Sequence, residues 1–146
     1  MQITGESRTA ARTDFTRWVY RIALLALCGA YLQGGLVKAF DFPGAVAEMK
    51  HFGLRPAELA AIATILLELG ASALILSGKY RWLGAFALAA FTLAATFLAN
   101  RFWEIPGAER GMVMNAFFEH LGLCGGLVLV ALNDLYQRTM PQAPSH

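Results

Sequence analysis

The chain has 146 residues, of which 57% are hydrophobic and only 15% are charged. A soluble domain carries nearer a quarter charged residues, so this composition, with a mean hydropathy of +0.49, predicts a membrane protein. The formal net charge is +2 and no basic run occurs, which excludes the electrostatic footprint of a nucleic-acid-binding protein.

The first apolar run follows a polar stretch. Residues 1–17 have no apolar core, so we expect a polar N-terminal tail rather than a cleavable signal. The first membrane span is expected at about 18–40, with Trp18 and Tyr20 as aromatic residues at its interface. Lys38, near its far end, can extend its ammonium group to the membrane surface.

Residues 41–56 separate the first span from the second and are too short and too polar to cross a bilayer. Asp41 is suited to cap a helix that has Pro43 in its first turn, and Gly53 is suited to end it. We therefore expect a short amphipathic helix that lies on the membrane surface.

Three further apolar runs reach the roughly 20 residues that cross the hydrocarbon core of a bilayer. They are expected at about 57–77, 82–102 and 112–132. The predicted fold class is all-α: an integral membrane four-helix transmembrane bundle with a short interfacial helix between spans 1 and 2. The predicted organisation is an N-terminal tail (1–17), a membrane domain (18–136) and a C-terminal tail (137–146).

An even number of spans places both termini on one side of the membrane. The side with the termini carries six basic residues outside the spans: Arg8, Arg12, Arg17, Lys79, Arg81 and Arg138. The other side carries four: Lys50, Arg55, Arg101 and Arg110. Because cytoplasmic loops are enriched in Lys and Arg, this bias predicts cytoplasmic N- and C-termini.

The fourth run contains an acid beside an imidazole, Glu119 and His120. A charge at the centre of a membrane helix costs about 2.5–3.5 kcal/mol on insertion scales, so such residues are expected to avoid lipid. At 100° per residue, Asn115, Glu119, Gly122 and Gly126 share a face, and His120 lies on its flank. Glycines spaced by four residues let another backbone approach closely, so Glu119 is expected to face a packed interface.

The other spans also have small or polar faces. Gly34, Gly35 and Lys38 cluster in the first span, Glu68 lies among small residues in the second, and Asn100 ends a polar stripe in the third. A four-helix bundle can turn all of these faces inward. We therefore expect a polar pocket that opens toward the outer surface, with Lys38 as the counter-charge of Glu119 or Glu68.

The binding-pocket candidates are Lys38, Glu68, Asn100, Asn115, Glu119 and His120. The helix-packing candidates are Gly34, Gly35, Gly122 and Gly126. Alternatives stay open: Lys38 can simply reach the surface, the two glutamates can serve packing alone, and His120 can be a hydrogen-bonded core histidine. No Cys/His cluster has the spacing of a zinc site, so no metal is expected.

Two segments carry a resemblance to a known family. "GGLVKAFDFPGAVAEMKHFGLRP" and "ATILLELGASALILSGKYRWLGAFAL" resemble conserved blocks of the DoxX family. The shared features are Gly35-x-x-Lys38, a Gly-Leu-x-Pro loop, Glu68 and a Gly-x-x-Arg turn, and the likeness extends over about residues 15–135. The resemblance implies a four-span protein of the bacterial inner membrane. Some members of the family are associated with quinone-linked sulfur oxidation, and others with an oxidoreductase assembly in oxidative-stress defence.

Three functions are consistent with these observations. The first is a non-autonomous accessory or anchoring subunit of a membrane redox system, with a protein partner. The second is a carrier or binding protein for a quinone, a lipid or another small molecule. The third, quinone-linked catalysis with Glu119 or His120 as proton shuttle, has least support because no electron carrier is visible in the sequence. Quinone is the candidate cofactor, and a homo-oligomer stays open.

Overall fold

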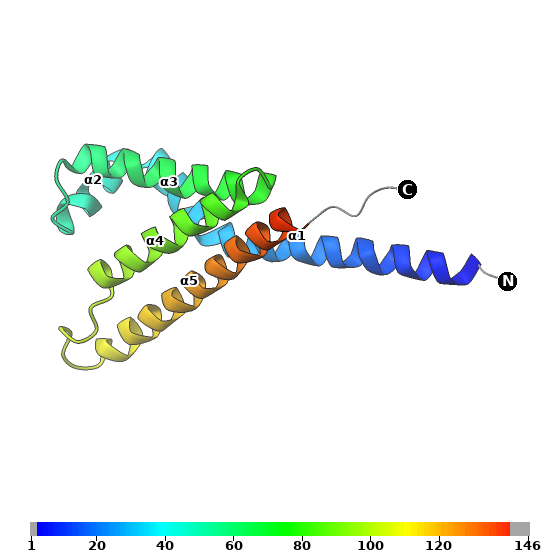
Figure 1. The fold of residues 1–146 in the computed structure, drawn as a ribbon. Coiled ribbons are helices and arrows are strands. Elements are labelled where there is room, and N and C mark those ends of the chain that lie inside the picture. The colour runs from blue at the N-terminus through cyan, green and yellow to red at the C-terminus, as the bar shows by residue number, and fades with distance from the viewer. Residues whose placement is uncertain (1–2, 141–146) are drawn as a thin grey trace.

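The computed structural model describes residues 3–140, with side chains from residue 14 onward, and this part of the chain is all-helical (Figure 1). Its helices, in chain order, are α1 (Ile3–Phe40), α2 (Phe42–His51), α3 (Ala57–Ser77), α4 (Arg81–Ala99) and α5 (Glu109–Thr139). Among the described residues, four segments are long and apolar enough to cross a membrane: Asp14–Phe40, Ala57–Ser77, Arg81–Ala99 and Glu109–Thr139. The predicted four-span architecture is confirmed, and α2 is the predicted short helix.

Two of the helices are longer than the predicted spans. α1 begins at Ile3, so most of the segment predicted as a polar tail is helical, and α5 continues to Thr139. A helix of 38 residues measures about 57 Å, nearly twice the ~30 Å of a hydrocarbon core. The first turns of α1 therefore project beyond the apolar region, and in Figure 1 they extend away from the other helices. Most of the predicted C-terminal tail, residues 141–146, lies outside the described residues.

The start of α2 follows the predicted capping pattern. The Asp41 carboxylate accepts a hydrogen bond from the Gly44 backbone N–H at 3.0 Å, and Pro43 occupies the first turn. Gly53 follows the helix with a φ of +72°, a conformation that glycine adopts without strain. The buried residues of α2 pack on the start of α3: Ala45, Val46 and Met49 against Ala57 and Ala61.

The spans pack through small residues. A Cβ added at Gly84 on α4 would lie 2.5 Å from the carbonyl oxygen of Ala71 on α3. A Cβ added at Gly35 on α1 would lie 2.8 Å from the Leu69 side chain, also on α3. Around these contacts the core is apolar, and its fully buried members include Cys28, Ile75, Leu88 and Leu127.

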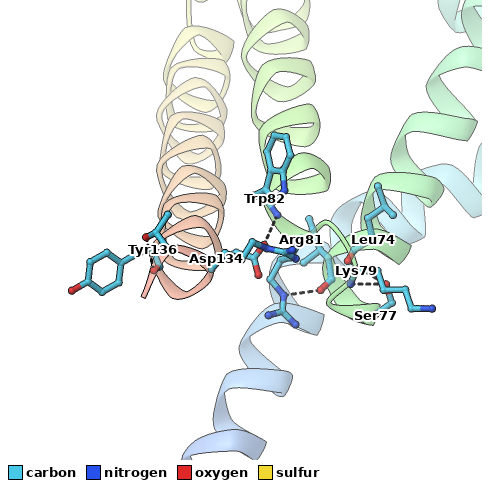
Figure 2. A network of polar contacts seen from close by, with 10 residues as sticks. Leu74, Ser77, Lys79, Arg81, Trp82, Asp134 and Tyr136 are labelled. Carbon is cyan, nitrogen blue, oxygen red and sulfur yellow. Dashed lines mark hydrogen bonds and ion pairs between the residues drawn. The ribbon is translucent and has the colours of Figure 1, made fainter. Parts of the chain in front are cut away.

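Polar contacts connect the helices at the end of the bundle that contains the α3–α4 turn (Figure 2). Arg81 donates from Nε to the carbonyl oxygen of Ile75 at 2.9 Å, and its guanidinium lies 5.5 Å from the ring centre of Tyr20 on α1. The Asp134 carboxylate on α5 accepts the Trp82 backbone N–H at 3.2 Å and so caps α4 from another helix. The four spans are thus joined at this end. With increasing distance from the α3–α4 turn, α4 and α5 separate from α3 (Figure 1).

Candidate functional site

A cavity of about 470 Å³ lies toward the opposite end of the bundle, and all five helices contribute to its walls. Most of the lining is apolar, including Met49, Phe91, Leu98 and Leu123. The polar side chains of the walls are Tyr31, Lys38, Glu48, Thr64, Glu68, Thr92 and His120. This combination of an apolar chamber with a few polar groups is typical of small-molecule sites.

An ion pair forms one polar wall of the cavity. Lys38 Nζ on α1 lies 3.4 Å from Oε2 and 3.5 Å from Oε1 of Glu68 on α3. Only 16% of the Lys38 side chain and 8% of the Glu68 side chain are exposed. A Cβ added at Gly34 would lie 3.5 Å from both carboxylate oxygens and from the ammonium nitrogen. Lys38 therefore pairs with Glu68 rather than with Glu119, and the glycine keeps the cavity side of the pair open.

A second polar contact joins α1 to α4. Tyr31 Oη lies 2.6 Å from Thr92 Oγ1, and Thr92 Oγ1 donates to the carbonyl oxygen of Leu88 at 2.7 Å. Because threonine has a single hydroxyl proton, the hydrogen bond between the two side chains must be donated by Tyr31. Neither residue was among the predicted pocket candidates, although Thr92 lies about two helical turns before Asn100 on the same helix face.

His120 contributes from α5. Its Nδ1 lies 2.6 Å from the carbonyl oxygen of Ala116 and 3.3 Å from the side-chain amide nitrogen of Asn100. A carbonyl oxygen can only accept, so Nδ1 carries a proton, and in the neutral form of the ring the lone pair is then on Nε2. With the proton on Nδ1, a hydrogen bond to Asn100 requires the amide oxygen in the place of the amide nitrogen. Asn100 lies beside His120 and is not part of the cavity wall.

Two further pocket candidates also lie outside the cavity wall. Glu119 and Asn115 are exposed on the outer surface of α5 and do not line the cavity. The prediction that Glu119 faces a packed interface within the bundle is therefore wrong. Neighbouring helical residues differ by about 100° in direction, and the helix is rotated so that His120 points inward. The flank of the predicted face, not its centre, meets the other helices.

Of the predicted packing glycines, three lie near another helix and one does not. Gly34 and Gly35 lie at the contact between α1 and α3. A Cβ added at Gly126 would lie 3.5 Å from the Leu27 side chain on α1. Gly122 is exposed, and a Cβ there would meet nothing within 4 Å. The prediction that Gly122 packs against another span of the chain is therefore wrong. Of the described glycines, Gly84 comes closest to another helix, and it was not among the predicted packing residues.

No group of three or more His, Cys, Asp or Glu side chains within reach of a common metal ion is present in the part of the chain that the structure describes. Cys28 and Cys124 are free thiols, and Cys28 is buried in the core. The described side chains of the cavity can thus supply one ammonium group, two carboxylates, hydroxyl groups and an imidazole.

Comparison with known proteins agrees with the resemblance found in the sequence. The model of the DoxX family matches residues 20–101, more than half of the chain. Inner membrane protein YphA of Escherichia coli (strain K12) is 27% identical over 111 residues, which are 76% of this chain and 79% of YphA. No solved structure gives a significant match. The matched range contains Tyr31, Lys38, Glu68 and Thr92, whereas His120 lies outside it.

Proposed function

This chain belongs to the DoxX family and is a multi-pass inner-membrane protein, and from that premise we propose that it binds a small amphiphilic molecule in the cavity between its spans. The occupant has an apolar body and a polar head. A quinone and a lipid both meet this description, and the mainly apolar lining disfavours a small, fully polar solute.

The cavity itself is the observation that carries this proposal. Its volume of about 470 Å³ falls within the roughly 300–1,000 Å³ of ligand pockets. The ion pair of Lys38 and Glu68 could have been sealed by close packing, but it borders open space. Ionisable residues inside a membrane are costly to retain and commonly mark ligand or ion sites. An ion pair at the wall of a cavity is suited to orient a polar head.

We also propose that the cavity opens on the outer side of the membrane. The support is the excess of basic residues on the side of the termini, which favours a cytoplasmic location for that side. The cavity lies toward the other end, between the C-terminal ends of α1 and α4 and beside α2. A ligand therefore enters from the outer leaflet or from the surface beyond it.

The test uses the full chain in lipid nanodiscs and a short-chain benzoquinone as probe. Ala95 lines the cavity on α4, so Ala95→Leu places three more carbon atoms inside it. Ala90→Leu, on the exposed face of the same helix, is the matched control. We expect binding to the original chain and to Ala90→Leu, and at least tenfold weaker binding to Ala95→Leu. Absence of binding by any retained or added amphiphile contradicts the proposal.

A second candidate function is an accessory or anchoring subunit, and the outer face of α5 favours it. Asn115, Glu119 and Gly122 lie on this face and are exposed. Glu119 is ten residues from the start of α5, which is about 15 Å along the helix and within the apolar region. A carboxyl group facing lipid there costs about 2.5–3.5 kcal/mol on insertion scales.

A transmembrane helix of a partner would remove this cost if it carried a basic or hydrogen-bond-donating side chain at the depth of Glu119. Gly122 leaves room for a close approach. In this role the partner performs the redox chemistry of a membrane system, and this chain is a non-catalytic subunit.

Purification in mild detergent tests the accessory role. We expect Gly122→Trp to abolish co-purification of the partner, whereas Leu93→Trp, on the exposed face of α4, leaves it intact. If the chain instead forms a dimer of itself that Gly122→Trp dissociates, the face is a homo-oligomer contact and the accessory proposal is wrong.

A further inference from the structure

We infer that the cavity selects amphiphiles whose polar head donates hydrogen bonds, such as a phenol or an alcohol, over those whose head only accepts them, such as an ether. This inference rests on the proposed binding function and specifies the class of ligand. It follows from the supply of donors and acceptors that the cavity walls offer.

The hydroxyl protons of the α1–α4 contact are already committed. Tyr31 donates to Thr92, and Thr92 donates to the carbonyl oxygen of Leu88. Neither residue has a proton left for a ligand, but the Tyr31 oxygen keeps a lone pair that can accept. This part of the wall is therefore an acceptor.

His120 is a second acceptor. The contact of 2.6 Å between its Nδ1 and the Ala116 carbonyl oxygen assigns the proton to Nδ1. In the neutral ring Nε2 then has a lone pair, and it has no hydrogen-bond partner among the described residues. Because the Ala116 carbonyl fixes the tautomer from within the same helix, Nε2 is the ring nitrogen left to accept from a ligand in the cavity that His120 lines.

The charged groups add further acceptors. Glu68, and Glu48 at the exposed edge of the lining, each add a carboxylate, against the three N–H groups of Lys38, which already lies against Glu68. The Thr64 hydroxyl can either donate or accept. Acceptors therefore outnumber the donors that a ligand can use. When a ligand displaces water and leaves these lone pairs without a donor, binding is weakened by the loss of their hydrogen bonds to water.

A hydroxyl group fits this supply because it can donate to His120 Nε2 or to Glu68 and still accept from Lys38. An ether oxygen can only accept from Lys38 and leaves the other groups unmatched. Among quinones, the same reasoning favours the hydroquinone form, which has two hydroxyl groups, over the oxidised form, which has two carbonyl oxygens.

The experiment compares 4-hexylphenol with 4-hexylanisole, its methyl ether, on the full chain in nanodiscs, with empty nanodiscs subtracted to remove lipid partitioning. One hydrogen bond to an acceptor of this kind corresponds to an affinity difference of about tenfold. We expect the phenol to bind at least that much more tightly. Equal affinities overturn the inference and leave the binding function standing, whereas failure of both probes to bind overturns the binding function.

Two variants test the assignment of the acceptor. His120→Phe keeps an aromatic ring and removes Nε2, so the preference for the phenol should fall by several fold while affinity for the ether is unchanged. Glu119→Gln, one residue away on the outer face, should leave both affinities unchanged. An undiminished preference in His120→Phe overturns the role of His120.

Discussion

The Lys38 ammonium group on α1 lies 3.4 Å from the Glu68 carboxylate on α3. Among the described side chains, this is the one ion pair that joins two membrane spans. The others are local in sequence: Arg17 with Asp14, Arg101 with Glu104, and Arg138 with Asp134. The Lys38–Glu68 pair therefore holds α1 to α3 and also supplies the charged wall of the cavity.

Removing one partner of this pair should destabilise the fold. Lys38→Met or Glu68→Leu leaves an unpaired charge, which costs about 3–5 kcal/mol at a sealed site, and less here because Lys38 keeps 16% of its side chain exposed. We expect a lower thermal unfolding midpoint in detergent for each single variant. The double variant should recover most of the loss, because no charge remains unpaired. Single variants as stable as the original chain would contradict a structural role for the pair.

The glycines should differ in their tolerance of alanine. Gly84→Ala should be the most destabilising, because its Cβ would meet the Ala71 backbone oxygen at 2.5 Å and backbone cannot easily move. Gly35→Ala should cost less, since it meets the Leu69 side chain. Gly122→Ala should be neutral or slightly stabilising in the isolated chain, because nothing lies within 4 Å and alanine has the higher helix propensity. Thermal unfolding of the three variants gives the order, and a Gly122→Ala loss equal to that of Gly84→Ala would disprove the packing described.

Replacing Asp134 should lower the stability of the fold more than replacing its ion-pair partner Arg138. It accepts both the Trp82 backbone N–H at 3.2 Å and Arg138 Nε at 2.9 Å. Asp134→Ala removes the cap of α4, which we expect to cost about 1–2 kcal/mol. Arg138→Ala removes only an i,i+4 pair whose arginine is 45% exposed, worth about 0.5 kcal/mol or less. Unfolding midpoints compare the two variants, and equal losses would assign the effect to the ion pair.

Thiol labelling can determine the orientation in the membrane. In a background of Cys28→Ala and Cys124→Ala, single cysteines replace Lys79 in the α3–α4 turn or Glu104 in the α4–α5 loop. With cytoplasmic termini, a membrane-impermeant maleimide added to intact spheroplasts should label Glu104→Cys and not Lys79→Cys. Inside-out vesicles should give the opposite pattern. The reverse result in both preparations would show that the termini lie outside.

Much of the architecture depends on local properties and was therefore predictable. The length of an apolar run determines whether a helix can cross a bilayer, and four such spans are present among the described residues. The Asp41 cap and Pro43 act within one turn, and α2 forms where they predicted it. The extra length of α1 and α5 was not predicted, because polar residues beyond the bilayer can remain helical without any apolar signal.

The amino-acid sequence alone thus determined the spans, the interfacial helix and the family, since hydrophobic length and capping are recorded in neighbouring residues. Only the tertiary structure decided which side chains meet. Tyr31 and Thr92 are 61 residues apart and Lys38 and Glu68 are 30 apart, and their pairing depends on how the helices rotate and cross. A rotation of about 100° separates His120 in the cavity wall from exposed Glu119, and contacts between helices, which a single helical period does not encode, set that rotation.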